Sequence, residues 1–496
     1  MSTTVNDAVL VGEDHETKKR DHRWWALAVL GLAQLMVVLD ATIVNIALPS
    51  AQASLGFSNA DRQWVVTAYA LSFGGLLLLG GKLADLVGRR RTFVIGLIGF
   101  ALSSAVGGAS TSFAMLVSAR AAQGAFGALL APAALSLLTT AFTDVSERAK
   151  AFAIYGAIAG AGAAVGLLLG GALTEYLSWR YTLYVNIVFA IVTTFGAFTF
   201  LRDQERTPRH RLDLAGTATA VGGLVALVYG FSEADTSGWT SPVTLGLLVG
   251  AVVLLGLFSF IEKRAASPLL PLRVILDRNR GGANLAILLV GVSMFGVFLF
   301  LTYYLQLTLG YSPIKTGLAF LPMVGAIMVS STVGGTQLLP RFGPRPLVSG
   351  GMLVSAVGMV LMAQISTTSG YVDHVLPSLI VTGLGMGLIF SAAMNVATAG
   401  ASAADAGVAS ALPNVAQQIG GALGPALLNT IATNAALGYR PTSPMSPAEI
   451  QQAAAVHGDV TAFTVVYIVL FASAVVTAFV LRGGRYDAQP GPMHIG

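Results

Sequence analysis

The chain is a succession of long apolar runs separated by short polar segments. Each run has about 20 residues or more, which is the length that an α-helix needs to cross the hydrocarbon core of a bilayer. The least distinct boundary separates the third run from the fourth. The pattern predicts an all-α integral membrane protein with fourteen membrane-spanning helices, at 24–48, 63–81, 92–110, 113–141, 148–173, 181–201, 213–231, 243–262, 282–306, 316–338, 346–366, 375–398, 406–432 and 461–481.

Two basic segments divide these runs into groups. They lie at 202–211 and 262–280, and the two runs between them leave six runs before and six after. Six plus six is the count of transporters built from two parallel repeats. We therefore predict a polar tail at 1–23, a six-helix bundle at 24–201, a linker with two additional membrane helices at 202–281, a second six-helix bundle at 282–481 and a tail at 482–496. The longest polar segment between runs, 433–460, contains three prolines, and we expect a flexible loop there, with an ordered flap as the alternative.

Composition and charge agree with a membrane protein and fix its expected orientation. The chain is 55% hydrophobic and 10% charged, and its mean hydropathy is +0.74. If the N-terminus is cytoplasmic, cytoplasmic segments carry 23 of the 28 Lys and Arg residues and outer loops carry four. This bias is the positive-inside pattern, so both tails are predicted to be cytoplasmic and the net charge of +5 indicates topology rather than nucleic-acid binding. The first apolar run is too long for the core of a secretory signal.

The chain lacks the residues that several kinds of binding site and reaction require. The chain has no cysteine, which excludes disulfides and thiolate metal sites, and its six histidines all lie outside the apolar runs. The glycine-rich string 75–82 lacks the spacing of a phosphate-binding loop, which argues against an ATP-driven pump. We therefore expect a protein that is not an enzyme and that has neither a metal nor a cofactor.

Two charges inside apolar runs are the main candidates for function. Asp40 lies in the first run, nine residues before Pro49, and Arg120 lies seven residues into the fourth run. At 1.5 Å per residue these positions correspond to depths of about 13 Å and about 10 Å from the outer surface. Because intramembrane charges are costly and mostly mark transport pathways, we expect the two to pair and to bind and release a proton. A static pair that holds helices together is the alternative.

A second candidate is the loop Gly81–Arg91, between the second and third runs. Gly81 and Gly88 permit a tight connection, and Asp85 lies among four basic residues. We predict that Asp85, with Arg89 and Arg90, forms a cytoplasmic gating motif. Simple anchoring by positive charge is the alternative.

These stretches resemble the signatures of a known family. Leu39–Pro49, Gly81–Arg91 and Arg120–Gly124 are similar to motifs of the major facilitator superfamily, and in particular of its fourteen-span drug–proton antiporters. The resemblance implies two six-helix bundles with two extra central helices, alternating access, Asp40 and Arg120 as proton-coupling residues, and Asp85 as part of the gate. It also implies a bacterial cytoplasmic membrane.

The chain departs from that family's pattern at two positions. Leu167 stands where the signature of the fifth span usually has proline, and Val188 stands where a proline usually follows the Asn186-Ile187 pair. The second half offers no acidic residue in mid-membrane, since Asp373 and Asp405 fall at the edges of runs. We therefore expect a hydrophobic substrate that is neutral, zwitterionic or singly charged, rather than a dication.

Polar residues inside the runs are candidates for lining a substrate cavity, although any one of them can equally be a hydrogen-bonding contact between helices. They are Gln34, Tyr69, Gln306, Asn395, Asn414 and Gln417.

The sequence thus predicts efflux of hydrophobic drugs or natural products, driven by the proton gradient and carried out by a monomer whose partners are the substrate, protons and the lipid bilayer. A proton-coupled importer or facilitator of a small metabolite is the first alternative. A non-transporting sensor or scaffold is the second, although the C-terminal tail is short for such a role.

Overall fold

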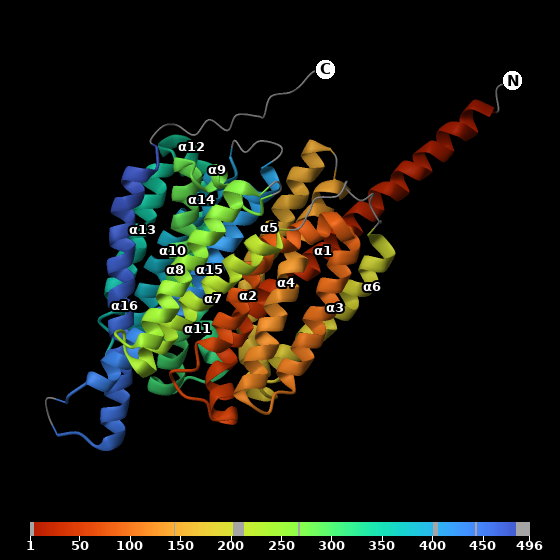
Figure 1. The fold of residues 1–496 in the computed structure, drawn as a ribbon. Coiled ribbons are helices and arrows are strands. Elements are labelled where there is room, and N and C mark those ends of the chain that lie inside the picture. The colour runs from red at the N-terminus through yellow and green to blue at the C-terminus, as the bar shows by residue number, and fades with distance from the viewer. Residues whose placement is uncertain are drawn as a thin grey trace.

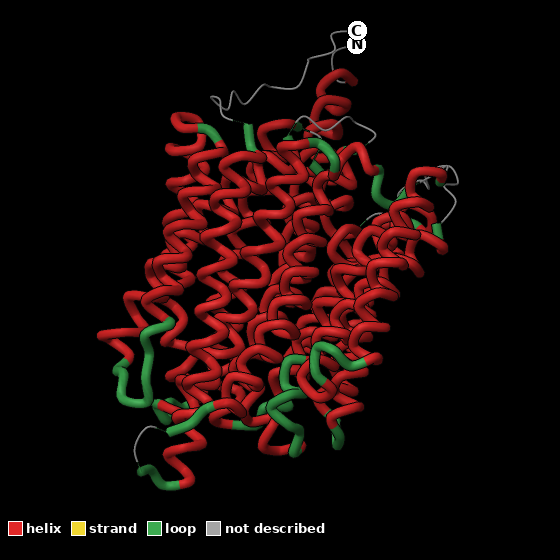
Figure 2. Tube along the Cα trace, turned by 60° about the vertical axis from the view of Figure 1, so that its left-hand side comes forward, coloured by secondary structure: helices red, strands yellow, loops and turns green. Residues whose placement is uncertain are grey.

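The computed structural model describes residues 4–142, 144–201, 213–265, 268–399, 405–441 and 444–482. Within these ranges the chain forms helices and connecting loops and no strand. Most helices run side by side through the molecule, and the loops gather at its two ends (Figures 1 and 2). In chain order the helices are α1 (Thr4–Leu55), α2 (Trp64–Val87), α3 (Arg89–Gly108), α4 (Phe113–Ala141), α5 (Val145–Tyr176), α6 (Tyr181–Phe200), α7 (Leu214–Ser237), α8 (Pro242–Arg264), α9 (Leu272–Ile275), α10 (Arg278–Tyr303), η1 (Tyr304–Thr308), α11 (Pro313–Val333), η2 (Gly334–Leu338), α12 (Leu339–Phe342), α13 (Pro344–Met362), η3 (Tyr371–Val375), α14 (Leu376–Thr398), α15 (Ala406–Gly438) and α16 (Pro447–Val480).

The two ends of the bundle are named here by the chain termini. The start of α1 and the end of α16 lie toward the top of Figure 1, and we call this end the terminal face and the opposite end the far face. The loop between α2 and α3 lies at the terminal face. The loop between α1 and α2 lies at the far face.

Thirteen helices of the described chain are long and apolar enough to cross a membrane. They confirm the predicted all-helical, multi-pass membrane fold, and the loop of residues 109–112 confirms the split between the third and fourth runs. The remaining predicted span, 406–432, forms α15, a single helix of 33 residues that is not among the thirteen. Its polar and glycine-rich sequence lowers its hydropathy, while packing between α2 and α10 buries much of it. Fourteen membrane crossings therefore stay a prediction.

The same packing pattern occurs twice. In the first half α1 packs on α5 and α6, α2 packs on α4, and α3 packs on α4 and α6. In the second half α10 packs on α15 and α16, α11 packs on α14, and α13 packs on α14 and α16. The contacts between the halves are also paired, since α2 packs on α15 and α5 packs on α11. Helices that take the same places in two groups are what an internal structural repeat produces.

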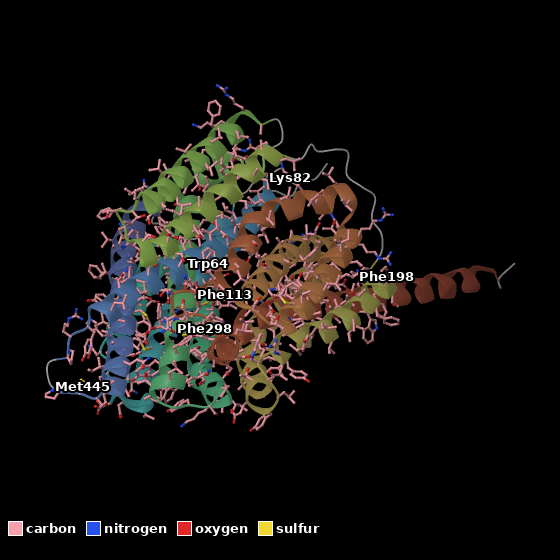
Figure 3. The ribbon with its side chains drawn as sticks, turned by 60° about the horizontal axis from the view of Figure 1, so that its bottom comes forward. Trp64, Lys82, Phe113, Phe198, Phe298 and Met445 are labelled. Carbon is pink, nitrogen blue, oxygen red and sulfur yellow. The ribbon has the colours of Figure 1, made fainter. Side chains whose placement is uncertain are left out.

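The two additional helices pack along one seam between the halves. α7 and α8 form a hairpin, and α7 packs on both α2 and α15. Near the far face, the Ser232 hydroxyl of α7 accepts hydrogen bonds from the Gln63 and Trp64 side chains. Thr430 of α15 donates to the Phe231 carbonyl of α7 at 2.8 Å. The hairpin is therefore bonded to both halves, and Figure 3 shows Trp64 beside it.

Two boundaries differ from the sequence-based expectation. The first membrane helix continues through Pro49 to Leu55, since one proline removes a single backbone donor and neighbouring helices support the rest. The loop predicted for 433–460 is wrong, because α15 extends to Gly438 and α16 begins at Pro447. A capping box between Ser446 and Glu449 starts α16, so a polar sequence forms its first turns.

Glycines allow helices to approach closely, both within the first half and between the two halves. On α5, Gly166 and Gly170 face the backbone of α1 near Leu39 and Ile43, and Gly171 faces Ile314 of α11. From the other side, Gly317 of α11 faces the Leu167 carbonyl. The glycine-rich face of α5 therefore contacts both α1 and the opposite half, as small residues do in membrane helix packing.

We expect Gly420→Ala to destabilise the fold. A β-carbon on Gly420 of α15 overlaps the Leu288 carbonyl oxygen of α10, and overpacking against backbone costs about 1–3 kcal/mol. The matched control is Gly250→Ala on α8, where a β-carbon meets nothing within 4 Å and the substitution should be neutral or stabilising by about 0.5–1 kcal/mol. Thermal unfolding in detergent micelles measures both, and equal stability of the two variants contradicts the packing described.

Candidate functional site

The Asp40 carboxylate is the centre of a buried polar network in the first half. The side chain is 0% exposed, and it lies 15 residues before the end of α1, which is about 22 Å along the helix axis. Arg120 Nη1 of α4 lies 2.6 Å from Asp40 Oδ2 and donates a hydrogen bond to it. The structure therefore brings together the two charges that the sequence singled out.

Arg120 is held on several sides. Its Nε donates to the Val65 carbonyl of α2 at 3.1 Å, and its Nη1 also donates to Gln123 Oε1 at 2.7 Å. The Tyr69 ring of α2 lies under the guanidinium, with its centroid 4.4 Å from Cζ. A guanidinium that is 1% exposed in a membrane needs such partners, because a buried unpaired cation is costly.

Three further residues complete the network, and the sequence did not mark them as site residues. Gln123 Nε2 donates to Asp40 Oδ1 at 2.8 Å, and Asn186 Nδ2 of α6 donates to the same oxygen at 2.7 Å. Both amides also donate to the Ser104 hydroxyl of α3, at 2.5 Å and 3.2 Å. Gln123 and Asn186 were visible as rare amides within apolar runs, whereas a single serine in a helix carries no such signal.

Three side chains hold the Asp40 carboxylate at once. It accepts hydrogen bonds from the guanidinium of Arg120 and from the amides of Gln123 and Asn186. Asn186 Oδ1 is buried and has no hydrogen-bond donor among the described residues. One amide oxygen of the network is therefore unsatisfied in this structure.

The residues of the loop motif, Gly81–Arg91, do not all contact one another. Gly88 ends α2 and starts α3 with φ at +107°, a conformation that favours glycine. Asp85 Oδ1 lies 3.7 Å from Arg89 Nη2, and both side chains are partly exposed. Arg90 lies elsewhere, since it donates to the Ala197 and Phe198 carbonyls at the end of α6. The gating role of these residues stays a prediction.

Lys82 of the same motif connects α2 to the linker. Its Nζ donates to the Pro268 carbonyl at 2.7 Å, between α8 and α9 (Figure 3). In the same region, Arg273 of α9 makes two hydrogen bonds to Asp405, which precedes α15. These bonds raise the pKa of the Arg273 guanidinium. The linker therefore contacts both halves at the terminal face.

The predicted cavity residues do not converge on one place. Tyr69 packs on Arg120, and Gln34 Oε1 accepts a hydrogen bond from the Tyr155 hydroxyl at 2.7 Å. Gln306 lies at the far face and donates to the Ile46 carbonyl at 3.0 Å.

The other three candidates lie on α14 and α15. Asn395 is exposed near the terminal face and donates to Ser391 of its own helix, while Asn414 and Gln417 are half-buried on α15. Substrate binding by any of the six stays a prediction.

At the far face the two halves are joined by direct hydrogen bonds. Arg62 Nε, before α2, donates to Asn429 Oδ1 of α15 at 3.0 Å, and Asn429 Nδ2 donates to Gln63 Oε1 at 2.9 Å. Tyr303 of α10 donates to Gln52 of α1 at 2.5 Å. The far face is thus closed by polar contacts between the halves.

Comparison with known proteins gives a consistent result. The sequence pattern of the Major Facilitator Superfamily matches residues 30–425. The chain is 50% identical over 468 residues to the puromycin resistance protein pur8 of Streptomyces alboniger, covering 94% of this chain and 92% of that protein. It is 38% identical to the cephamycin export protein CmcT of Amycolatopsis lactamdurans, covering 99% of each. It is 34% identical to the tetracenomycin C resistance and export protein of Streptomyces glaucescens, covering 87% of this chain and 80% of that protein.

Among solved structures, a bacterial homologue of the human lysosomal transporter Spinster, in an inward-facing and unoccupied conformation, shares the fold. The TM-score is 0.64 at 16% identity, covering 93% of this chain and 98% of that one. Together with the repeated six-helix packing and the matched residues, these findings show that the chain belongs to the Major Facilitator Superfamily.

Proposed function

We propose that this protein exports hydrophobic drugs or natural products in exchange for protons, by alternating access of the two halves. The observation that carries the proposal is the fully buried Asp40–Arg120 pair, in a chain whose relatives are named for antibiotic resistance and export. A buried ion pair is a weak source of stability, so a pair retained in a membrane bundle is better explained by a functional role.

In this mechanism Asp40 binds the proton and Arg120 controls its release. The charged carboxylate is stabilised by Arg120, Gln123 and Asn186. Protonation removes its attraction for Arg120, which then keeps its bond to Gln123 and its bond to the Val65 carbonyl. Because these partners lie on α2 and α4, a change at Asp40 alters how α1 packs against them. This change biases the equilibrium between the two accessible states.

The proposal includes an orientation and a location. We place the terminal face on the cytoplasmic side of a bacterial cytoplasmic membrane, because 23 of the 28 basic residues fall there if fourteen helices cross. The closed far face is then the outer gate. The protein is proposed to act as a monomer, to need no cofactor beyond the proton gradient, and to catalyse no chemical reaction.

We infer the substrate class from the names of the relatives and from the acidic residues available within the membrane helices. Puromycin, cephamycin and tetracenomycin C appear in the relatives' names, and we propose that the substrate here is likewise a natural product or drug, in a neutral, zwitterionic or singly charged form. A proton-coupled importer or facilitator on the same fold is the alternative within transport, and a non-transporting sensor lies outside it. An exporter, an importer or facilitator, and a sensor can be distinguished by measuring the direction in which a drug moves and whether protons move with it.

We expect Asp40→Asn to abolish drug-dependent proton movement. In proteoliposomes with an imposed pH gradient, wild type should move protons when a hydrophobic drug is added, and the variant should not. The asparagine cannot carry the proton, and it leaves Arg120 buried without its counter-charge, at a cost of about 3–5 kcal/mol of stability.

A double variant separates coupling from folding. Asp40→Asn combined with Arg120→Gln removes both charges, so it should recover much of the lost stability and still move no protons. If the double variant shows drug-dependent proton flux at the wild-type rate, the coupling site is not Asp40. If wild type moves the drug without moving protons, the protein is a facilitator and not an antiporter.

We also expect Asp85→Asn to slow transport several-fold while changing drug affinity by less than twofold. The carboxylate lies at the terminal face, far from the buried network, so its loss should change how fast the cytoplasmic side closes rather than what binds. Arg91→Gln, in the same loop but outside the proposed gate, is the control. Transport rates in proteoliposomes and drug binding in detergent measure the two effects, and an unchanged rate in Asp85→Asn removes it from the gate.

A further inference from the structure

Residues 268–275, which lie between α8 and α10 and which we call the strap, are positioned by one buried carboxylate. Both oxygens of Glu262, near the end of α8, accept backbone hydrogen bonds, from the Leu269 amide at 3.3 Å and from the Leu270 amide at 3.1 Å. Glu262 is 4% exposed, and its Oε1 lies 3.0 Å from the position that a β-carbon on Gly216 of α7 would take. The carboxylate therefore lies between the α7–α8 hairpin and the strap, and it fixes the path of the backbone at the start of the strap.

The strap is bonded to the second half through α9. Arg273 Nε donates to Asp405 Oδ2 at 2.9 Å, and Arg273 Nη2 donates to Asp405 Oδ1 at 2.8 Å. Such a bidentate pair fixes the relative orientation of its two side chains. Asp405 is 5% exposed and directly precedes α15, and α9 is followed after two residues by α10. The strap is therefore expected to move with the second half.

The same segment contacts the first half through one charged side chain and through apolar packing. Lys82 Nζ of α2 donates to the Pro268 carbonyl at 2.7 Å. Leu270 and Val274 are buried in a hydrophobic cluster that also contains side chains of α2 and α15. The strap thus joins the two halves at the terminal face, where α9 lies (Figure 1).

α2 connects this contact to the far face. It is one continuous helix, Trp64–Val87, in which Lys82 lies 18 residues, or about 27 Å, from the first residue. Directly before the helix, Arg62 hydrogen-bonds across the halves to Asn429, and this bond helps to close the far face. A rigid helix that swings away from the second half at one end also shifts its other end relative to that half. Opening of the far face is therefore expected to displace Lys82 from the Pro268 carbonyl.

We propose that the strap is a latch for the state in which the far face is closed, with Lys82 as the residue that engages it and Glu262 as the residue that positions it. The bond from Lys82 to Pro268 is present together with the closed far face, so it stabilises this state relative to one in which the far face is open. The inference rests on the proposed alternating access, but on neither proton coupling nor the direction of transport.

The test follows a single introduced cysteine, because the chain has none of its own. Thr67 of α2 is 0% exposed and donates to the Ala422 carbonyl of α15 at 3.4 Å, so Thr67→Cys reports opening between the halves near the far face. The measurement is the rate at which a water-soluble maleimide alkylates this thiol in the full-length protein, in detergent and without any drug.

Lys82→Met should raise the alkylation rate about threefold or more, because it removes the donor to Pro268 and keeps an apolar stem. Lys82→Arg can still donate to the carbonyl, so its rate should stay close to that of the parent protein. Glu262→Gln should also raise the rate, because an amide side chain turns a donor toward one of the two backbone N–H groups that the carboxylate accepts. Lys263→Met is the matched control, since it removes an exposed basic residue next to Glu262 and should change nothing.

A second reporter separates a shift between states from unfolding. Ser355 of α13 is 0% exposed and donates to the Thr382 carbonyl within the second half, so Ser355→Cys should stay unreactive in every variant. The latch is overturned if Lys82→Met leaves the alkylation of Thr67→Cys unchanged, or if Lys82→Arg accelerates it as much as Lys82→Met does. It is also overturned if both reporters become reactive together, because the strap then supports folding and not the gate.

The outcome can be told apart from that of the export proposal. If Asp40→Asn abolishes drug-dependent proton movement while Lys82→Met leaves the alkylation rate unchanged, antiport stands and the latch is refuted. If the alkylation rates change as expected while wild type moves no protons, the latch stands and antiport is refuted.

Discussion

The structure depends on the cost of placing charge where water is absent. Asp40 and Arg120 are tolerated inside the bundle because α1 and α4 present them to each other at hydrogen-bonding distance and because α2, α3 and α6 supply the remaining donors and acceptors. Five of the first six helices therefore have to converge on one carboxylate. The packing of these helices is thus tied to one hydrogen-bonded network, which a purely apolar core does not provide.

The sequence predicted the helices and the main pair because both depend on strong local signals. Apolar runs of membrane length have few alternative structures, and two opposite charges at similar depth have few alternative partners. Ser104 and Asn186 escaped prediction as site residues because small polar side chains in membrane helices more often bond within their own surroundings. Arg90 was predicted in the gating motif, but its partners were not foreseen, since they are backbone carbonyls of α6 and no residue type marks a carbonyl.

The largest difference between expectation and structure concerns α16. Hydropathy placed its start near residue 461, whereas the helix begins at Pro447 with a capping box that averages over apolar residues cannot detect. Asp459 consequently moved from an expected loop into a buried helical position, and the second half gained an acid near its outer end. A helix boundary error of fourteen residues thus changed the charge assigned to the interior.

The α7–α8 hairpin gives the two seams between the halves different mechanical properties. On the α2–α15 seam, Ser232 and Phe231 bond to both halves, and the linker bonds to both again at the other end. The α5–α11 seam has no bridging hairpin in the described chain. Glycines line it, and the Ile314 amide of α11 donates one hydrogen bond across it to Glu175 of α5. Alternating access, as proposed above, would then rock the halves unevenly, with the braced α2–α15 edge as the pivot and the α5–α11 edge moving furthest. A lipophilic molecule dissolved in one leaflet would find its sideways entrance at the α5–α11 edge.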